Sequence, residues 1–506
     1  MADENTDRGN HDEIRRDLLR TAIKQPLLKI VQENREKNND EPIDVIIEAN
    51  DGYYAGKEEA VKEVQRLVKE VAGVETWSIG TAQNPYYKAS LTAKQILEII
   101  DRDDSNAFRT RDEAAKHREQ AALKGVRPPE QVTRYLAILR IWYDHPISPL
   151  IDKSVSTVKA DAAHRAFLAE GKDIVWAVID SGIDGTHEHF ANGTLEVSLP
   201  VRHCDFTGSG DDTKALVDAF GHGTHVAGIV AGAYASTDRK AKAQRTKLGE
   251  GNKVEVFEEE ISQIAGMAPA CKLVSFKVLG DNGKGAVSNI LAAIDRIQAI
   301  NDFGRNLKIH GANLSVGYEF DPLWFACGQS PVCVEVNRLV RSGVVVVVAA
   351  GNTGYGVLTS NQRVTGAGFM LTINDPGNAD LAITVGSTHR DSPHTYGVSY
   401  FSSKGPTGDG RMKPDLVAPG ERILSCCSSM KPGASGTNTY VEDSGTSMAA
   451  PHVSGVVAAF LSIRREYIGS PDKVKELFLS TATDLGRNSY FQGRGLIDLM
   501  RAIQSI

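Results

Sequence analysis

The chain has 506 residues with a net charge of −7, from 57 Lys and Arg against 64 Asp and Glu, and 41% of its residues are hydrophobic. This composition excludes disorder over the whole length and supplies enough apolar residues for a large core. The acidic balance argues against a nucleic-acid binder, whose contact face is usually basic. At about 150 residues per domain, the length predicts roughly three domains, or one large enzyme domain and an accessory one.

The sequence shows no export signal and no membrane span. Residues 1–20 are polar and charged, without the apolar core of a secretory signal peptide. The longest uninterrupted apolar run, Val344–Ala350, has the length of a strand. Six cysteines in a chain of this length do not make a disulfide framework. We therefore expect a cytoplasmic protein that binds neither a membrane nor nucleic acid.

Two regions precede the largest part of the chain. Residues 1–41 are expected to form a polar helical extension, whose one helical pattern ends at Pro26. Residues 42–150 are predicted to form a small domain with the element order strand–helix–strand–strand–helix–strand, which is typical of a ferredoxin-like α+β fold. Its predicted elements are the strands 43–49, 74–80, 86–91 and 135–143, the helix 57–72, and a helix that Thr92 caps.

Residues 151–506 show the Gly-rich alternation of strands and helices of an α/β domain. The predicted strands are 174–179, 271–278, 307–315 and 344–350, and the predicted helices are 223–235, 287–300 and 333–341. Such alternation indicates right-handed crossovers and a mostly parallel sheet. The segment 236–262 interrupts the pattern with basic residues followed by acidic ones, and we expect it to be a solvated surface loop or a helical hairpin.

Four polar residues stand at strand ends and helix starts, where parallel α/β sheets usually carry their functional residues. Asp180 follows the predicted strand 174–179, and Asn352 follows a strand made almost entirely of valine. His222 lies at the entry to a helix, and Ser447 opens another, where free N–H groups favour negative charge. A nucleophile, an imidazole base, an acid that orients it and an oxyanion donor make a serine hydrolase. Each residue alone also fits a turn, a packing histidine or a helix cap.

The segments around these four residues resemble the subtilisin-like serine proteases. They read VIDSGID, GHGTHVAG, VVAAGN and GTSMAAPHVSG, in the order of that family, and the similarity extends over residues 153–506. The resemblance implies a subtilisin-like three-layer α/β domain and a serine endopeptidase. It makes Asp180 the residue that orients the base, His222 the base, and Ser447 the nucleophile. It makes Asn352 the oxyanion donor, together with the backbone N–H of Ser447.

The resemblance also implies that a protein or peptide substrate binds as an extended strand along one edge of the cleft. Tyr318 stands where the family often has a second glycine, which argues against a wide-open pocket for the side chain before the scissile bond. Glu319 and Asp321 nearby favour a basic side chain in that pocket, unless they face solvent. The residues implied in substrate binding are Leu314, Ser315, Val316, Gly317 and Gly351.

This chemistry requires no cofactor, and we assign no residue to a metal. The best-known calcium site of the family takes an Asp where this sequence has His189, so Ca²⁺ is not expected there, while sites elsewhere stay open. His222 and His225 have no third ligand for Zn²⁺ beside them. Cys327 and Cys333 are open to a disulfide, a metal clip or two free thiols; in a reducing compartment we expect free thiols.

Residues 42–150 resemble the propeptide of this family by fold pattern and position. The resemblance implies that this domain assists folding and inhibits the protease as an intramolecular partner. It also implies autocleavage between about Asp144 and Asp152. An unrelated accessory or partner-binding domain is the alternative.

Two rival functions fit parts of the sequence. An α/β-hydrolase esterase needs a carboxylate and then a His after the nucleophile. The only later histidine is His452, five residues after Ser447, so this fold is excluded. A catalytically silent interaction protein on a subtilisin-like scaffold stays open, although none of the triad residues is altered.

Overall fold

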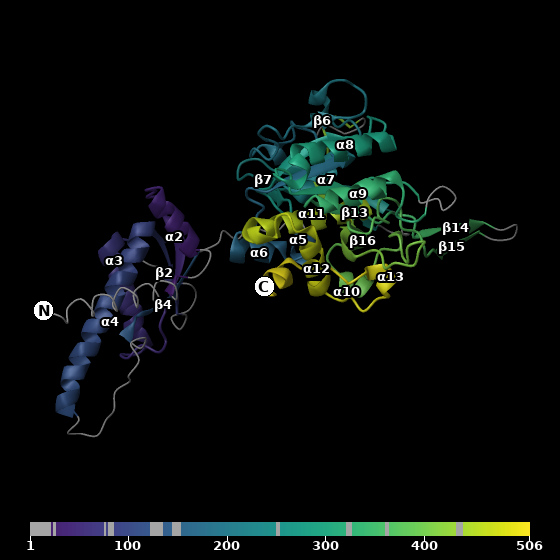
Figure 1. The fold of residues 1–506 in the computed structure, drawn as a ribbon. Coiled ribbons are helices and arrows are strands. Elements are labelled where there is room, and N and C mark those ends of the chain that lie inside the picture. Colours follow the sequence, from purple (N-terminus) through teal and green to yellow (C-terminus); the bar gives the residue numbers. More distant parts are fainter. Residues whose placement is uncertain are drawn as a thin grey trace. The chain divides into compact units, whose positions relative to one another are not determined.

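A computed structural model of the chain describes residues 22–23, 27–74, 77–78, 85–121, 135–143, 153–248, 254–319, 326–359, 364–431 and 439–506. The chain divides into two compact units, and the sequence passes from the first to the second at residues 147–148 (Figure 1). The predicted cleavage segment 144–152 lies outside the described residues.

The N-terminal unit contains a four-stranded antiparallel sheet in the order β2-β3-β1-β4. Its elements follow the predicted ferredoxin-like order: β1 Ile43–Ala49, α3 Lys57–Ala72, β2 Trp77–Ser78, β3 Tyr86–Leu91, α4 Ala93–Ala121 and β4 Ile138–Tyr143. Val45 and Ile47 of β1 are buried against Val64 of α3 and Ile96 of α4 in one apolar core. Alternating residues of β1 therefore face this core.

The expectation for segment 1–41 needs correction. Helix α2, Leu27–Glu36, begins just after Pro26 and buries Leu27 and Val31 in the core of the N-terminal unit. This part of segment 1–41 is therefore not a separate extension. Helix α4 continues through the charged stretch that follows its apolar turns. The helical pattern before Pro26 lies outside the described residues, apart from residues 22 and 23.

The C-terminal unit is built on a seven-stranded sheet in the order β17-β16-β13-β12-β5-β11-β6, in which every neighbouring pair is parallel. The strands are β5 Val175–Asp180, β6 Cys204–Asp205, β11 Lys272–Lys277, β12 Gly311–Leu314, β13 Val345–Ala349, β16 Ile383–His389 and β17 Leu416–Glu421. The predicted parallel sheet is confirmed, and β16 and β17 extend it beyond the strands that the sequence indicated.

Helices cover both faces of this sheet and make three layers. Val346 and Val348 of β13 face the core formed with α8, Val287–Ile300, and α9, Pro331–Arg341. Val345 and Val347 face the opposite core, formed with α7 and α11. These two helices span His222–Val230 and Thr446–Ile463. A strand buried on both faces needs apolar residues at every position, which explains the run of valines.

Helix α11 is, within the described residues, the one helix long and apolar enough to cross a membrane. In this structure 83% of it is buried inside the protein. It packs against α7 and several sheet strands, so its composition is that of a central core helix.

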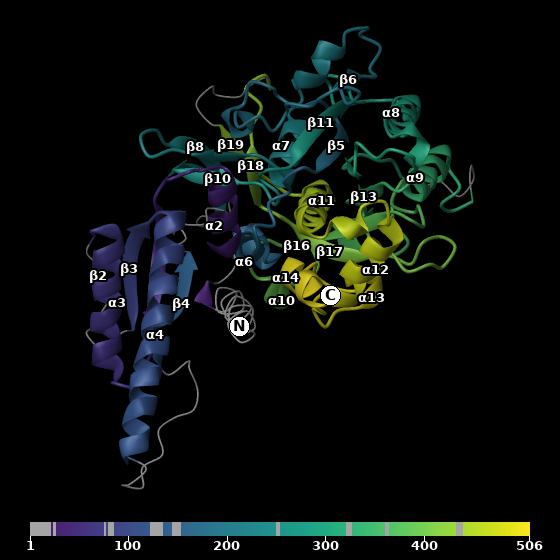
Figure 2. The ribbon, with the colours of Figure 1, turned by 60° about the vertical axis from the view of Figure 1, so that its left-hand side comes forward.

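We expected the segment 236–262 to be a surface loop or a helical hairpin, but it contains a β-hairpin. Its strands β8, Ala241–Leu248, and β9, Val254–Ile261, extend a small sheet in the order β18-β19-β8-β9 (Figure 2). Basic side chains of β8 face acidic ones of β9 across the pair, as in Lys247–Glu255 at 3.3 Å. Two charge blocks of opposite sign therefore match an antiparallel pairing. The other two strands are β18 Ile423–Cys426 and β19 Tyr440–Asp443.

A second hairpin and several short elements complete the C-terminal unit. They are α5 Lys153–Thr157, α6 Ala160–Phe167, β7 Ala233–Ala235, β10 Gln263–Ala265, β14 Tyr355–Thr359, β15 Val364–Gly368, α10 Pro393–Tyr396, α12 Pro471–Thr481, α13 Ser489–Gln492 and α14 Leu499–Gln504.

Candidate active site

Asp180 and His222 lie side by side although 42 positions separate them in the sequence. Nδ1 of His222 is 2.8 Å from Oδ1 of Asp180. Asp180 ends β5 and is buried, with 1% of its surface exposed, and His222 is the first residue of α7. Because the carboxylate accepts this hydrogen bond, Nδ1 is assigned the proton, and Nε2 is left to accept one.

Gly223 allows α7 to approach the turn after β5. A Cβ atom at Gly223 would lie 2.1 Å from the carbonyl oxygen of Gly182, so any other residue would push the two segments apart. The backbone N–H of Gly223 donates to Oγ of Ser181 at 2.9 Å. The small residue beside His222 therefore brings the imidazole within reach of Asp180.

The surroundings of His222 favour its protonated form. Burial has the largest influence on the pKa of His222 and lowers it. The charge and hydrogen bond of Asp180, with the charges of Asp443 and Asp218, outweigh burial and raise this pKa above its ordinary value of 6.5. The imidazole becomes a free base only above this raised pKa.

Ser447 is held at the start of α11 by a reciprocal pair of hydrogen bonds with Ser315. The hydroxyl of Ser447 donates to the carbonyl oxygen of Ser315 at 3.0 Å, and the hydroxyl of Ser315 donates to the carbonyl oxygen of Ser447 at 2.9 Å. The helical partner of the Ser447 carbonyl would be the N–H of residue 451, which is a proline. Ser315 follows β12 directly, so this pair joins α11 to the end of that strand.

Asn352 is oriented by Thr446, the residue before Ser447. Its Oδ1 accepts hydrogen bonds from the backbone N–H and the hydroxyl of Thr446 at 2.9 and 3.0 Å. Because Oδ1 of Asn352 accepts both hydrogen bonds, the other terminal atom of the Asn352 side chain is assigned as the amide nitrogen Nδ2. The amide therefore lies beside the first N–H groups of α11, which have no helical partner. Donors arranged in this way suit an oxyanion.

One cleft of about 690 Å³ joins these elements. His222, Asn352 and Ser447 line it, and Asp180 lies buried behind His222. Of the residues implied in substrate binding, Leu314 is buried in the core. The others line the cleft: Ser315, Val316, Gly317 and Gly351. A larger cleft of about 950 Å³, lined by α9, α12 and nearby loops, contains none of these residues.

Tyr318 also lines the cleft and pairs with Asp375, whose N–H donates to the Tyr318 carbonyl at 3.0 Å. Glu319 is exposed and is not among the residues that line the cleft, so it does not support a basic pocket. Asp321 lies outside the described residues.

Comparison with known proteins gives a consistent result. The family model described as "Subtilase family" matches residues 171–495. Subtilisin E from Bacillus subtilis (strain 168) is 30% identical over 361 residues, which cover 71% of this chain and 73% of subtilisin E. The chain belongs to the subtilase family. Serine protease AprX from the same strain is 29% identical and covers 69% of this chain and 70% of its own length. Pyrolysin from Pyrococcus furiosus is 32% identical over 56% of this chain, but this covers only 21% of pyrolysin.

This subtilase is therefore a serine peptidase that acts on proteins or peptides. The matched region contains all four candidate catalytic residues, as well as the cleft segments that follow β12 and β13. The N-terminal unit lies before it.

His189, which stands where the family resemblance implied a calcium-binding Asp, is buried with 1% of its surface exposed. Its Nδ1 lies 3.3 Å from the hydroxyl of Tyr440, and burial lowers the pKa of His189 to about 3, so the ring is neutral. Within the part of the chain that the structure describes, no three His, Cys, Asp or Glu side chains are grouped as metal ligands.

All six cysteines of this subtilase are free thiols. The sequence allowed a disulfide or a metal clip between Cys327 and Cys333. Both residues are buried. Burial raises the pKa of Cys333 to about 12, which suppresses the thiolate needed for nucleophilic attack or metal binding.

Two charged residues close to Asp180 and His222 were missed in the sequence. Asp218 is fully buried and accepts hydrogen bonds at 2.8 Å from the backbone N–H groups of Gly221 and Thr224, so it caps α7. Lys277 is 3% exposed. A lysine within the otherwise apolar end of strand β11 was the available signal.

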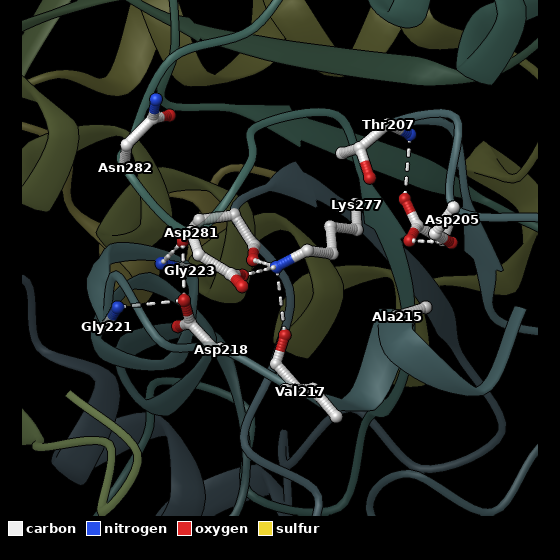
Figure 3. Close-up of polar contacts among 12 residues, drawn as sticks. Asp205, Thr207, Ala215, Val217, Asp218, Gly221, Gly223, Lys277, Asp281 and Asn282 are labelled. Carbon is white, nitrogen blue, oxygen red and sulfur yellow. Dashed lines mark hydrogen bonds and ion pairs between the residues drawn. The ribbon is translucent and has the colours of Figure 1, made fainter. Parts of the chain in front are cut away.

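Lys277 joins the segments that carry Asp180 and His222. Figure 3 shows its ammonium group with dashed lines to Val217 and Asp281. Its ammonium group donates to the carbonyl oxygens of Ser181 at 2.6 Å and Val217 at 3.0 Å, and it lies 3.2 Å from Oδ1 of Asp281. One buried cation thus holds the turn after Asp180, the loop before His222 and a loop near the cleft.

Proposed function

We propose that this subtilase is an endopeptidase that cleaves peptide bonds through an acyl-enzyme on Ser447. The observation that supports this best is the 2.8 Å hydrogen bond between His222 and Asp180 beside the cleft that Ser447 lines. In the reaction, the Ser447 hydroxyl gives up its bond to Ser315 and passes its proton to Nε2 of His222. Its Oγ then attacks the peptide carbonyl carbon.

The negative charge that develops on the carbonyl oxygen is stabilised by the Asn352 amide and the backbone N–H of Ser447. Asp180 keeps His222 in the required tautomer and stabilises the imidazolium. When the C–N bond breaks, His222 returns its proton to the leaving amine. Water then adds to the acyl-enzyme with His222 again as base, which releases the second product and restores Ser447.

The substrate in this proposal lies as an extended strand along Ser315, Val316 and Gly317. A Cβ atom at Gly317 would lie 2.4 Å from the carbonyl oxygen of Asp375, so the segment stays close to the opposite wall of the cleft. Backbone pairing of this kind accepts many sequences and leaves selectivity to the side-chain pockets.

We further propose that the N-terminal unit inhibits the peptidase and is removed by autocleavage between residues 144 and 152. Its strand order β2-β3-β1-β4 supports this, because the resemblance to a propeptide rests on a ferredoxin-like fold. We also propose a cytoplasmic protein that needs no metal for catalysis. A chelator would then leave its activity unchanged.

The proposal is tested with a fluorophosphonate probe and mass spectrometry of the full chain beside Ser447→Ala. We expect the probe to label the wild type only, and we expect a cleavage between residues 144 and 152 that Ser447→Ala abolishes. If neither the full chain nor the chain without residues 1–150 is labelled, the proposal is wrong and a catalytically silent interaction protein is the better interpretation. Labelling without cleavage would remove only the autocleavage step.

A further inference from the structure

Strands β14 and β15 form a hairpin that extends away from the central sheet (Figure 1). They pair with each other, Tyr355 opposite Gly368 and Val357 opposite Gly366. Among the described strands neither has another neighbour, so both outer edges carry backbone groups free to pair with a further strand.

The exposed surface of this hairpin is apolar. Val357 is 61% exposed, Leu358 is 55% exposed and Tyr355 is 46% exposed. The described residues from 354 to 374 include no charged side chain; Arg363, which comes between the two strands in the sequence, lies outside the described residues. Proteins usually protect an exposed edge with charge, as the hairpin of β8 and β9 does with its rows of Lys and Glu. An exposed apolar edge without such protection marks a binding surface.

Two glycines of β15 make room for the ring of Tyr355 on one face of the hairpin. Gly366 and Gly368 stand opposite Val357 and Tyr355, so no side chain of β15 covers that face at these positions. The ring of Tyr355 lies over Gly366, where a Cβ atom would come within 1.8 Å of its hydroxyl oxygen, and it packs edge-on against the ring of Tyr400. This face of the hairpin therefore presents an aromatic surface.

The segments that flank the hairpin on both sides reach the catalytic cleft. Asn352 and Thr353 precede β14, Asn374 and Asp375 follow β15, and all four line the cleft. The hydroxyl of Thr353 contacts Oδ1 of Asn374 at 3.1 Å, which ties the two ends together. A polypeptide that occupies the cleft and continues beyond it therefore passes the base of this hairpin.

We propose that the β14–β15 hairpin is an exosite that binds an extended apolar segment of a protein substrate outside the catalytic cleft. The occupant is the substrate because the hairpin is continuous with the cleft wall. Exposed apolar segments in extended form belong to unfolded proteins, so the exosite selects these over short peptides. This inference rests on the proposed endopeptidase function and adds its substrate class.

The test compares β-casein, an unfolded protein, with a chromogenic tetrapeptide that fills only the cleft. The variant Val357→Ser/Leu358→Ser changes two exposed side chains and leaves the cleft residues in place. We expect its kcat/KM to fall about tenfold for casein, mainly through a higher KM, and to stay unchanged for the tetrapeptide. The matched control is Val256→Ser, which removes a side chain of similar exposure, 58%, from the charged hairpin and should change neither.

A second measurement does not need turnover. In the full chain carrying Ser447→Ala, binding of fluorescein-labelled casein should weaken about tenfold on addition of Val357→Ser/Leu358→Ser. Unchanged binding and unchanged casein cleavage would overturn the exosite. So would an equal loss for both substrates, which would mean that the hairpin shapes the cleft.

Two results would assign the hairpin to another occupant and also overturn the inference. A dimer of the wild type that becomes a monomer in the variant points to a second copy of the chain. Faster tetrapeptide hydrolysis by the variant points to the N-terminal unit of the chain itself. A wild type that hydrolyses neither substrate would overturn the proposed function instead.

Discussion

Pro451 stands four residues after Ser447 in α11 and removes the N–H that would otherwise bond the Ser447 carbonyl. The hydroxyl of Ser315 takes its place at 2.9 Å. The first turn of α11 is therefore held partly by the end of strand β12 rather than by the helix itself.

Ser315→Ala should destabilise the protein by about 1–3 kcal/mol, because it leaves the partly buried carbonyl of Ser447 without a donor. In the double variant with Pro451→Ala, residue 451 regains its N–H, so the cost of Ser315→Ala should shrink. Urea unfolding in a Ser447→Ala background, which avoids self-digestion, measures the free-energy cost of Ser315→Ala with and without Pro451→Ala. If Ser315→Ala costs the same with and without the Pro451→Ala substitution, the two groups do not share this role.

The raised pKa of His222 predicts the direction of the pH dependence. Only the neutral imidazole accepts a proton, so kcat/KM should fall as the pH drops through a midpoint above 6.5. Asp180→Asn removes the negative charge that raises this pKa, so the midpoint should move down while kcat falls about 10⁴-fold. Asp443→Asn removes a weaker contribution and should move the midpoint slightly while kcat is retained. A midpoint that is unchanged in Asp180→Asn would contradict the assignment of the base.

Asn352→Leu keeps the side-chain size but removes the amide donor. We expect kcat to fall about 10²–10³-fold with little change in KM, the range found in subtilisin for loss of one oxyanion donor. Thr446→Val removes one of the two hydrogen bonds that orient Asn352 and should give a smaller loss in kcat. Steady-state kinetics on a peptide substrate separates the two parameters. A rise in KM at constant kcat would place Asn352 in ground-state binding instead.

Lys277 and Asp281 should contribute unequally although they form one ion pair at 3.2 Å. Lys277→Met leaves the buried carbonyl oxygen of Ser181 and the partly buried one of Val217 without this donor, so we expect a loss of about 2–5 kcal/mol. The Asp281 side chain is 70% exposed, so Asp281→Asn should cost at most about 1 kcal/mol. Urea unfolding in the Ser447→Ala background tests both. Similar losses for the two variants would mean that the exposed carboxylate, and not the two carbonyls, secures the lysine.

Glu442 links the inserted hairpin of β8 and β9 to the strand that precedes Ser447. Its buried carboxylate bonds Arg390 and accepts from Arg245 at 3.1 Å and from the N–H of Thr246 at 2.9 Å. Burial tends to raise the pKa of Glu442, but the Thr246 hydrogen bonds and Arg390 outweigh it and lower the pKa. Glu442 is therefore charged at neutral pH.

Arg245→Gln should destabilise the protein by about 1–3 kcal/mol, since it removes a charge-assisted hydrogen bond to a buried carboxylate. Lys247→Gln on the same strand breaks only an exposed pair and should cost less than about 1 kcal/mol. Thermal unfolding of both variants in the Ser447→Ala background gives the comparison. Equal effects would show that the hairpin is held by its surface charges alone.

Periodicity and motif together predicted most of the C-terminal unit. The valine run of β13 needed both faces buried, and the segments around Asp180, His222, Asn352 and Ser447 pointed to strand ends and helix starts. These are local signals: spacing along a strand or helix depends on neighbours in sequence. The same signals predicted the element order of the N-terminal unit, where alternating and helical patterns are separated by clear breaks.

The tertiary structure decided what depends on distant partners. The charge blocks of 236–262 indicated a loop or helices. In the structure β8 and β9 pair as a hairpin, and the pairing of β8 with β19 makes this hairpin part of a sheet. Helix α2 looks like a polar extension until the buried positions of Leu27 and Val31 are known. The contacts of buried Lys277 and the hydrogen bonds between Ser447 and Ser315 join residues that are far apart in the chain. Burial and long-range hydrogen bonding fix these features, and apart from the lysine at the end of strand β11 no local pattern indicates them.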